Sequence, residues 1–277
     1  MTITISDVPV RKSILVRTPV EDAFEVFTEE IDSWWPRSHH IGKSPLRRVV
    51  MEGRAGGRCY TEHADGSESD WGRVLEWEPP HRLVLAWRIT HEWTHEPDLA
   101  RASEVEVRFV PQPGAVTRVH VEHRFFDRHG AGGDTMRGAV DAPNGWTKVL
   151  ALFADQVSAR GTRETVQRYF DHLAAHEGWE GLLAPDLVFT SYTSPIKQVN
   201  GRDAFLTSTS RFYSTIASVQ VRDLLVDGER ACALTRYELQ PPNGGPRFAS
   251  DVAEVFSVRN GKIDSFSIYF DTAPYPK

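Results

Sequence analysis

The stretch GWTKVLALFADQVSARG, residues 145–161, decides how this 277-residue chain folds. Its apolar residues recur every three or four positions, which is the spacing of one helix face, at Trp146, Val149, Leu150, Phe153 and Val157. Such a stripe needs an apolar surface to pack against. Gly161 and Thr162 then indicate a helix stop and the N-cap of a new helix. We therefore predict two domains, residues 1–159 and 160–277, with almost no linker between them.

The residues that precede this helix alternate between apolar and polar side chains, as β-strands do. Val105, Val107 and Phe109 fall on one side of such a strand, and the charged residues between them fall on the other. A helix signal over residues 19–35 comes before most of the strands, and turn-forming segments such as EPPH and PQPG join them. The first domain is therefore predicted to be an antiparallel meander with one solvated face and one face against the helix.

The second domain begins with predicted helices, at residues 162–176 and around residues 178–184. A strand near LVFTSY and a helix after Gly201 precede four strands, which the segments VDGER, QPPNGGP and RNGK join as hairpins. Helices followed by a meander indicate an α+β fold rather than a parallel doubly wound sheet.

The composition argues against several classes of protein. The net charge is −6 and the sequence has no long basic run, so it does not predict the basic surface that binding to nucleic acid or an anionic membrane requires. No apolar run approaches the roughly 18 residues of a membrane span, and the first residues lack a signal-peptide pattern, so we expect a cytoplasmic protein. The two cysteines, Cys59 and Cys232, lie far apart and predict neither a disulfide nor a thiolate metal cage.

The letters HEWTH, residues 91–95, satisfy the zinc-binding HExxH pattern. That pattern acts from a helix, whereas here a strand-like segment precedes it and Pro97 follows it. No second group of ligands with zinc-like order accompanies it. We therefore predict neither a metal nor any other cofactor.

Several segments of the first domain carry a resemblance to a known family. VRTPVEDAFEVFTEEIDSWWP, WGRVLEWEPPHRLVLAW and VHVEHRFFDRHG, with the GW-containing helix, resemble the SRPBCC superfamily, which has the START and birch-pollen-allergen fold. The branch they resemble most is that of homologues of the activator of the heat-shock ATPase. The resemblance covers residues 9–158. It implies a helix-grip fold, in which a curved antiparallel sheet surrounds a long C-terminal helix and leaves a ligand cavity between them.

In the second domain, NGRDAF and EVFSVRNGKIDSFSIYFDTA are similar to the SnoaL-like polyketide cyclases of the nuclear-transport-factor-like superfamily. This resemblance covers residues 162–273. It implies an α+β cone-shaped barrel that is hollow inside and often dimeric. We accordingly expect a homodimer that forms through residues 217–270.

The last strand bears on whether the cone is an enzyme. Limonene-epoxide hydrolases and SnoaL-type cyclases typically have W-R-D-Y-F-D there, with a catalytic aspartate before the tyrosine. This chain has FSIYFD, so Ile268 stands in the carboxylate's place and cannot move a proton. Arg236 and Glu238 correspond to the Arg-x-Asp pair of the neighbouring strand, and they are the catalytic candidates if the cone is an enzyme. Phe189 and Ser191 stand where the family has Tyr and Asn.

Arg236 and Glu238 are two residues apart, so both lie on one face of their strand. If that face is inward, the two charges must pair with each other or bind a ligand. A structural ion pair is the preferred interpretation, because such pairs also occur where nothing is catalysed.

The expected partner is a small hydrophobic molecule. Seven of the eight tryptophans fall in the first domain and predict an aromatic cavity wall, with ordinary core packing as the alternative. His123 lies between apolar neighbours on the inward face, either as a core histidine or as the polar group of the cavity. The expected ligand-binding residues are Trp35, His39, Trp87, His123, Trp146, Phe189, Tyr192, Arg236, Glu238, Val252 and Ile268.

Three functions fit these patterns. The first is a two-domain small-molecule-binding protein with hydrophobic cavities, which acts on or sequesters a hydrophobic compound. The second is a cyclase, isomerase or epoxide-hydrolase-like enzyme that uses the cone, although the missing aspartate argues against epoxide hydrolysis. The third is a co-chaperone-like ATPase activator, which only the name of one branch of the first family suggests.

Overall fold

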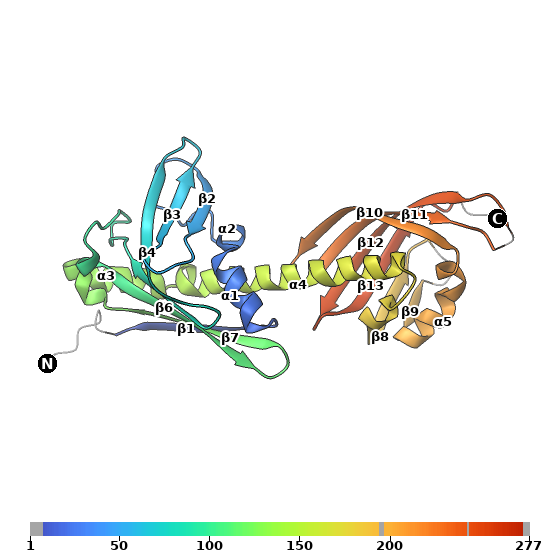
Figure 1. The fold of residues 1–277 in the computed structure, drawn as a ribbon, viewed down its shortest axis with the longest axis horizontal. Coiled ribbons are helices and arrows are strands. Elements are labelled where there is room, and N and C mark those ends of the chain that lie inside the picture. The colour runs from blue at the N-terminus through green and yellow to red at the C-terminus, as the bar shows by residue number, and fades with distance from the viewer. Residues whose placement is uncertain (1–7, 194–196, 243, 274–277) are drawn as a thin grey trace. The chain divides into compact units, whose positions relative to one another are not determined.

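A computed structural model describes residues 8–193, 197–242 and 244–273 of the chain. The chain divides into two compact units, Met1–Val157 and Ser158–Lys277 (Figure 1). The first seven residues, on which the expectation of no signal peptide partly rests, lie outside the described part. Among the described helices, none is long and apolar enough to span a bilayer.

The first unit is built on one seven-stranded sheet in the order β1-β7-β6-β5-β4-β3-β2. All neighbouring strands in it pair antiparallel, as the alternating pattern predicts. The strands are β1 (Val10–Val16), β2 (Leu46–Met51), β3 (Arg58–His63), β4 (Glu68–Glu78), β5 (Arg82–Trp87), β6 (Ser103–Gln112) and β7 (Val116–Arg124).

A long helix, α4 (Lys148–Ala174), begins in this unit, and Figure 1 shows the sheet curling around its first part. All five residues of the apolar stripe that ends at Val157 are buried, and the Phe153 ring meets the Phe27 ring edge-on with 5.2 Å between centroids. Burying a side chain of this size is worth about 1.5–3 kcal/mol. The stripe therefore packs α4 against the first unit's core. The predicted helix-grip fold is confirmed.

Short helices complete the first unit. α1 (Val20–Thr28) and α2 (Ile31–Trp34) fill the segment that the helix signal over residues 19–35 marks. Between β7 and α4 lie helical segments that the sequence pattern did not indicate, because they are rich in glycine and poor in apolar residues. They are η3 (Phe126–Gly132), α3 (Gly133–Asp141) and a π-turn, η4 (Pro143–Thr147), while η2 (Leu99–Arg101) precedes β6.

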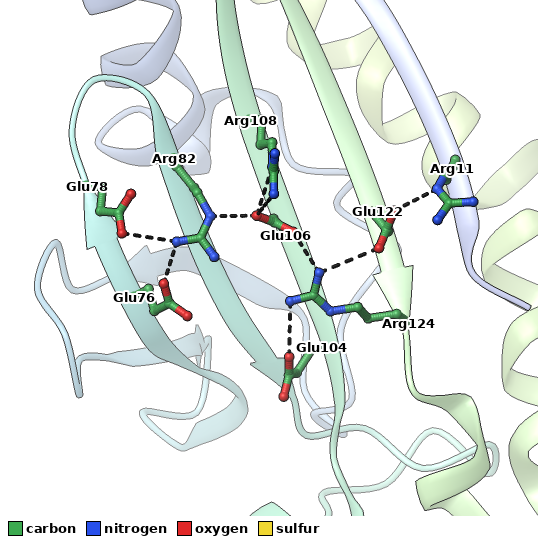
Figure 2. A network of polar contacts seen from close by, with 9 residues as sticks. All are labelled: Arg11, Glu76, Glu78, Arg82, Glu104, Glu106, Arg108, Glu122 and Arg124. Carbon is green, nitrogen blue, oxygen red and sulfur yellow. Dashed lines mark hydrogen bonds and ion pairs between the residues drawn. The ribbon is translucent and has the colours of Figure 1, made fainter. Parts of the chain in front are cut away.

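The outer face of this sheet carries a network of ion pairs centred on Glu106 (Figure 2). Glu106 is only 4% exposed and accepts hydrogen bonds from Arg82 at 2.5 Å, Arg108 at 2.9 Å and Arg124 at 2.6 Å. Burial alone would raise the pKa of Glu106, but the three guanidinium groups outweigh it and lower the pKa to about 2. The predicted polar face is therefore present, and its central carboxylate is desolvated and fully paired.

The second unit contains a six-stranded sheet in the order β10-β11-β12-β13-β8-β9. Its strands pair antiparallel except β13 and β8, which run parallel. The elements are η5 (Trp179–Leu182), β8 (Leu183–Ser191), β9 (Gln198–Asn200), α5 (Arg202–Tyr213), β10 (Ile216–Asp227), β11 (Arg230–Leu239), β12 (Phe248–Arg259) and β13 (Lys262–Phe270). This is the predicted α+β cone, with the helical segments and the four final strands in the expected order.

One secondary-structure prediction at the junction is wrong. Gly161 and Thr162 lie inside α4 and neither end one helix nor begin another. A glycine inside a helix costs only about 1 kcal/mol relative to alanine. The burial of Val157 on one side and of Val166 on the other outweighs that cost. The helix therefore continues from the core of the first unit into that of the second.

Candidate functional site

The first unit encloses a cavity of about 370 Å³ whose wall is mostly indole and aliphatic carbon. The sheet, the segment after α2, and the helices α3 and α4 each supply part of it. The lining residues are Trp35, Ser38, His39, His40, Ile41, Trp71, Trp87, Ile89, Trp93, Ala139, Val140, Asn144, Gly145, Trp146 and Val149. A concave, mainly apolar site with a few polar groups is the usual form of a small-molecule site.

Four of the indole rings form a continuous wall. Trp35 stacks on Trp71 with 5.4 Å between centroids and 17° between planes. Trp71 meets Trp87 at 5.9 Å, and Trp87 meets Trp146 at 5.9 Å, both at 60°. All four are buried, whereas Trp93, which also lines the cavity, is 51% exposed. The site therefore offers flat aromatic surfaces at more than one angle.

Polar atoms on this wall are few, and some lack a partner within the described residues. Nε1 of Trp87 and Nδ1 of His40 are buried and make no hydrogen bond there. Nε1 of Trp35 instead donates to the backbone oxygen of His39 at 2.9 Å. An indole N–H can only donate, so a buried one without an acceptor is costly. The Trp87 N–H is thus an unused hydrogen-bond donor of a residue that lines the cavity.

His39 is a titratable residue on the wall of the cavity. Burial lowers the pKa of His39 below its ordinary value, and the nearby ammonium group of Lys148 lowers it further. The ring is therefore neutral at pH 7. A neutral imidazole can accept a proton at one nitrogen and donate one from the other.

Behind the wall, His123 anchors the indole of Trp146. Nε1 of Trp146 donates to Nδ1 of His123 at 3.2 Å, and Nε2 of His123 lies 2.8 Å from Oγ of Ser103, which in turn lies 2.9 Å from Nε2 of His129. Because the indole can only donate, Nδ1 accepts and Nε2 carries the hydrogen of a neutral ring. Burial lowers the pKa of His123 well below its ordinary value, and His129 lowers it further.

The cone of the second unit holds a smaller cavity, of about 190 Å³. Aromatic and aliphatic side chains dominate its wall, with Ser191, Tyr237 and Glu254 among the polar ones. The lining residues are Phe189, Ser191, Phe205, Ser208, Thr209, Phe212, Tyr213, Tyr237, Val252, Glu254, Phe266, Ile268 and Phe270.

The structure brings most of the expected ligand-binding residues to one cavity or the other. Trp35, His39, Trp87 and Trp146 line the first cavity, and Phe189, Val252 and Ile268 line the second. His123 is fully buried and reaches the first cavity only through Trp146. Tyr192 lines neither; it is 52% exposed and stacks on Tyr269 with 4.6 Å between ring centroids.

Arg236 and Glu238, which were expected to bind a ligand, do not point into the cone. Residues alternate along a strand, and on β11 the inward side belongs to Tyr237, which lines the cavity and is buried. Arg236 lies outside, where it contacts Glu238 at 3.5 Å and Asp251 at 3.4 Å. The ion pair exists, but on the solvated face of the sheet.

The acidic residue that does line the cone is Glu254, which is not among the expected ligand-binding residues. Glu254 shares a strand face with Val252 and Phe256, two residues away on either side, and all three are buried. Since Val252 was expected to line the cavity, the period of two placed Glu254 beside it. The letters VAEVF, residues 252–256, carry that signal.

No group of three or more His, Cys, Asp or Glu side chains that could hold a metal ion occurs in the described parts of the chain. His95 of the HEWTH segment instead lies 2.9 Å, through Nδ1, from the backbone oxygen of Asp70. The segment itself is a turn between β5 and η2 rather than a helix.

Two family profiles match the sequence. The one described as activator of Hsp90 ATPase homolog 1-like protein matches residues 17–184, and the SnoaL-like domain matches residues 166–266. Both resemblances that the sequence segments carried are thereby confirmed. No curated protein matches the chain.

Among solved structures, an anthrahydroquino-gamma-pyrone synthase, Txn09, complexed with SUM, is 44% identical, with 56% of this chain and 99% of that one covered and a TM-score of 0.41. A candidate SnoaL-like polyketide cyclase from Mesorhizobium loti is 18% identical, with coverages of 39% and 97% and a TM-score of 0.34. An NTF2-like protein of unknown function from Burkholderia pseudomallei K96243 is 23% identical, with coverages of 41% and 92% and a TM-score of 0.37.

Proposed function

The chain belongs to the family of activator of Hsp90 ATPase homolog 1-like proteins, and we propose that its first unit binds a flat, fused-ring aromatic compound in the tryptophan-lined cavity. The observation that carries the proposal is the wall of four buried indoles, Trp35, Trp71, Trp87 and Trp146. Stacked or edge-on aromatic pairs are worth about 0.5–1.5 kcal/mol each beyond the apolar area that they bury. The family description names an ATPase activator, but a shared fold does not fix an activity.

The polar atoms of the wall narrow the class of ligand. The Trp87 N–H requires an acceptor, so the bound compound carries an oxygen near that indole, as a quinone or pyrone carbonyl does. The 44% identity with the synthase, across 99% of that protein's length, supports the same class, because its name describes a fused aromatic system with oxygen substituents. We therefore expect an aromatic polyketide rather than an aliphatic lipid.

Binding is tested with 1,8-dihydroxyanthraquinone, followed by quenching of tryptophan fluorescence and by calorimetry. Trp87→Phe keeps an aromatic ring and removes the N–H, so the affinity should fall by about 1–3 kcal/mol, or roughly 5- to 150-fold. Trp179→Phe is the matched control, because Trp179 is buried in the second unit and lines neither cavity. Equal affinities for wild type and Trp87→Phe would refute the assigned donor, and no binding at all would refute the ligand class.

Catalysis in the same cavity is a second candidate, because neutral His39 lies on its wall. A pyrone ring can be closed by the addition of a phenolic oxygen to the triple bond of an alkynyl ketone, and we propose this reaction as the test. The O–H bond and one C–C π bond break, the O–C bond forms, and the proton moves from oxygen to carbon. His39 is the group proposed to carry that proton.

This step is measured by chromatography with a 1-hydroxyanthraquinone that bears an alkynyl ketone next to its hydroxyl group. We expect the rate above the spontaneous background to fall about 100-fold or more in His39→Gln, while the affinity for 1,8-dihydroxyanthraquinone stays within a factor of three. A wild-type rate equal to background would leave the first unit as a binding module only.

We also propose that the protein forms a homodimer through residues 217–270. In support, the cone's sheet exposes apolar side chains, with Leu225 of β10 at 59% and Leu234 of β11 at 42%. Light scattering at micromolar concentration should give twice the mass of the 31.3 kDa chain, and Leu234→Glu should lower it. A single-chain mass for the wild type would refute the dimer.

A further inference from the structure

Glu254 of β12 is a buried acid in an apolar cavity with one oxygen unused. The residue is 3% exposed and lines the cavity of the cone. Its Oε1 accepts a hydrogen bond from the hydroxyl group of Tyr237 at 2.6 Å, whereas Oε2 is buried without a partner among the described residues. Buried polar atoms without partners are rare in folded proteins, and each requires an explanation.

The surroundings of Glu254 favour the neutral acid. Burial raises the pKa of Glu254 to about 7, although the hydrogen bond from Tyr237 acts in the opposite direction. The hydroxyl group of Thr235 donates instead to the backbone oxygen of Val252 at 3.1 Å. The titratable groups that interact with it are Tyr237 from β11, Tyr169 from α4 and Tyr213 from α5. None of the three is a cation, so nothing in this set stabilises the carboxylate as a guanidinium would.

In the neutral form the two oxygens have different roles. Oε1 accepts from Tyr237, and so the proton resides on Oε2, which becomes a hydrogen-bond donor. The Oγ of Ser191, on β8, is a second buried atom of the same cavity without a partner in the described chain. Two unused polar groups in one aromatic-walled cavity are the pattern of a site that orients a small ligand.

We propose that the cone is a second ligand site, in which Glu254 donates a hydrogen bond from Oε2 to the carbonyl oxygen of a small, mainly apolar cyclic ketone. Phe189, Phe205 and Phe266 supply the apolar wall against which such a ring packs. The cavity is about half the volume of the one in the first unit, so the two sites take ligands of different size. This proposal does not depend on the function of the first unit.

The proposal is tested with 1-tetralone and with tetralin, which has the same rings without the oxygen. The protein is labelled with ¹³C at the isoleucine δ1 methyl groups. Ile268 reports on the cone, and Ile41 and Ile89 report on the other cavity. The Ile268 signal is assigned from its absence in Ile268→Val.

We expect tetralone to shift the Ile268 methyl signal and to bind more tightly than tetralin at pH 5.5. If only the neutral acid binds, the apparent Kd of tetralone should rise about 30-fold between pH 5.5 and pH 8.5, following the fraction of protonated Glu254. Tetralin should bind equally at both values of pH. Glu254→Gln keeps a donor at every pH, so it should still bind tetralone but without the pH dependence.

Three results would overturn the proposal, and the first two need no variant. The first is that tetralone shifts only the Ile41 and Ile89 signals, and the second is that tetralone binds in the cone no more tightly than tetralin at pH 5.5. The third is a pH dependence that persists in Glu254→Gln, whose folding is verified by its methyl spectrum without ligand.

Discussion

Glu254 of β12 lies directly opposite Ile268 of β13 in the antiparallel ladder. Both side chains line the cavity of the cone. Ile268 occupies the position at which the last strand of SnoaL-type cyclases and limonene-epoxide hydrolases was expected to carry an aspartate. The cone of this chain therefore keeps a carboxyl group, but one strand away and with a tyrosine, rather than an arginine, as its hydrogen-bond partner.

Glu254→Gln should stabilise the second unit at high pH. The folded-state pKa is raised from 4.5 to about 7, so the native state of the wild type is favoured fully below pH 4.5 and loses that advantage as the pH rises through 7. From pH 5 to pH 8.5 the free energy of unfolding of the wild type should drop by about 2–3 kcal/mol relative to the variant. Amide hydrogen exchange in β12 at both values of pH measures the difference, and parallel pH profiles would contradict the raised pKa.

Ile268→Asp should place a second carboxyl group within reach of the first. Cβ atoms of directly opposed residues lie about 4.5–5.5 Å apart, so two negative charges there repel each other strongly. We expect a loss of more than about 2 kcal/mol in the free energy of unfolding at pH 8.5 and a smaller loss at pH 5. Asparagine is close to aspartate in size but uncharged. Ile268→Asn should therefore lose the same amount of unfolding free energy, relative to the wild type, at both values of pH.

His123→Phe should destabilise the first unit by about 1–3 kcal/mol, because Nε1 of Trp146 and Oγ of Ser103 lose a common partner. The folded pKa of His123 lies well below 6.5, so the wild type is most stable above pH 6.5 and loses stability as the pH falls below that value. The variant should lose less on acidification. Urea unfolding followed by tryptophan emission tests both points, with exposed His120→Ala as the variant expected to behave like the wild type.

Glu106→Gln should leave three guanidinium groups without their shared carboxylate. We expect the free energy of unfolding to fall by about 2 kcal/mol or more at pH 7. The folded pKa is lowered to about 2, so this carboxylate stabilises the wild type above pH 4.5 and ceases to do so as the pH falls toward 2. Glu76→Gln is the control, because the Glu76 side chain is 50% exposed and should change stability by less than about 1 kcal/mol.

Fragments 1–159 and 160–277 should each fold. The cut divides α4, but each piece keeps its own buried stripe, which ends at Val157 in the first and begins at Val166 in the second. Circular dichroism with cooperative thermal unfolding of both fragments is the expected result. An unfolded fragment of either kind would show that the intact helix is required for its core.

The sequence predicts the fold well where apolar spacing is regular and burial decides the structure. The stripe from Trp146 to Val157 and the alternation around Val107 lead directly to the helix and to the sheet that curls around it. The same reasoning fails at Gly161, because the local preference of one glycine is weaker than the packing of the helix on either side of it.

The candidate sites are less predictable, because they depend on which face of a strand is inward. Arg236 and Glu238 follow the family's charge pattern, yet alternation turns them outward and brings Tyr237 into the cone. Glu254 has no counterpart in the family's motifs, so only its position two residues from Val252 indicates that it lies in the cone. The unused oxygen of Glu254 and the unused N–H of Trp87 are properties of packing in three dimensions, and no spacing of letters encodes them.

The continuous helix α4 also has an evolutionary consequence. Residues 158–161, where the units meet in sequence, carry no side chain that either core buries. A genetic exchange at these codons would join one coding segment to another without removing a buried side chain from either product. Related genes are therefore expected to recombine within this helix, so that the tryptophan-lined unit occurs alone or with a different C-terminal module.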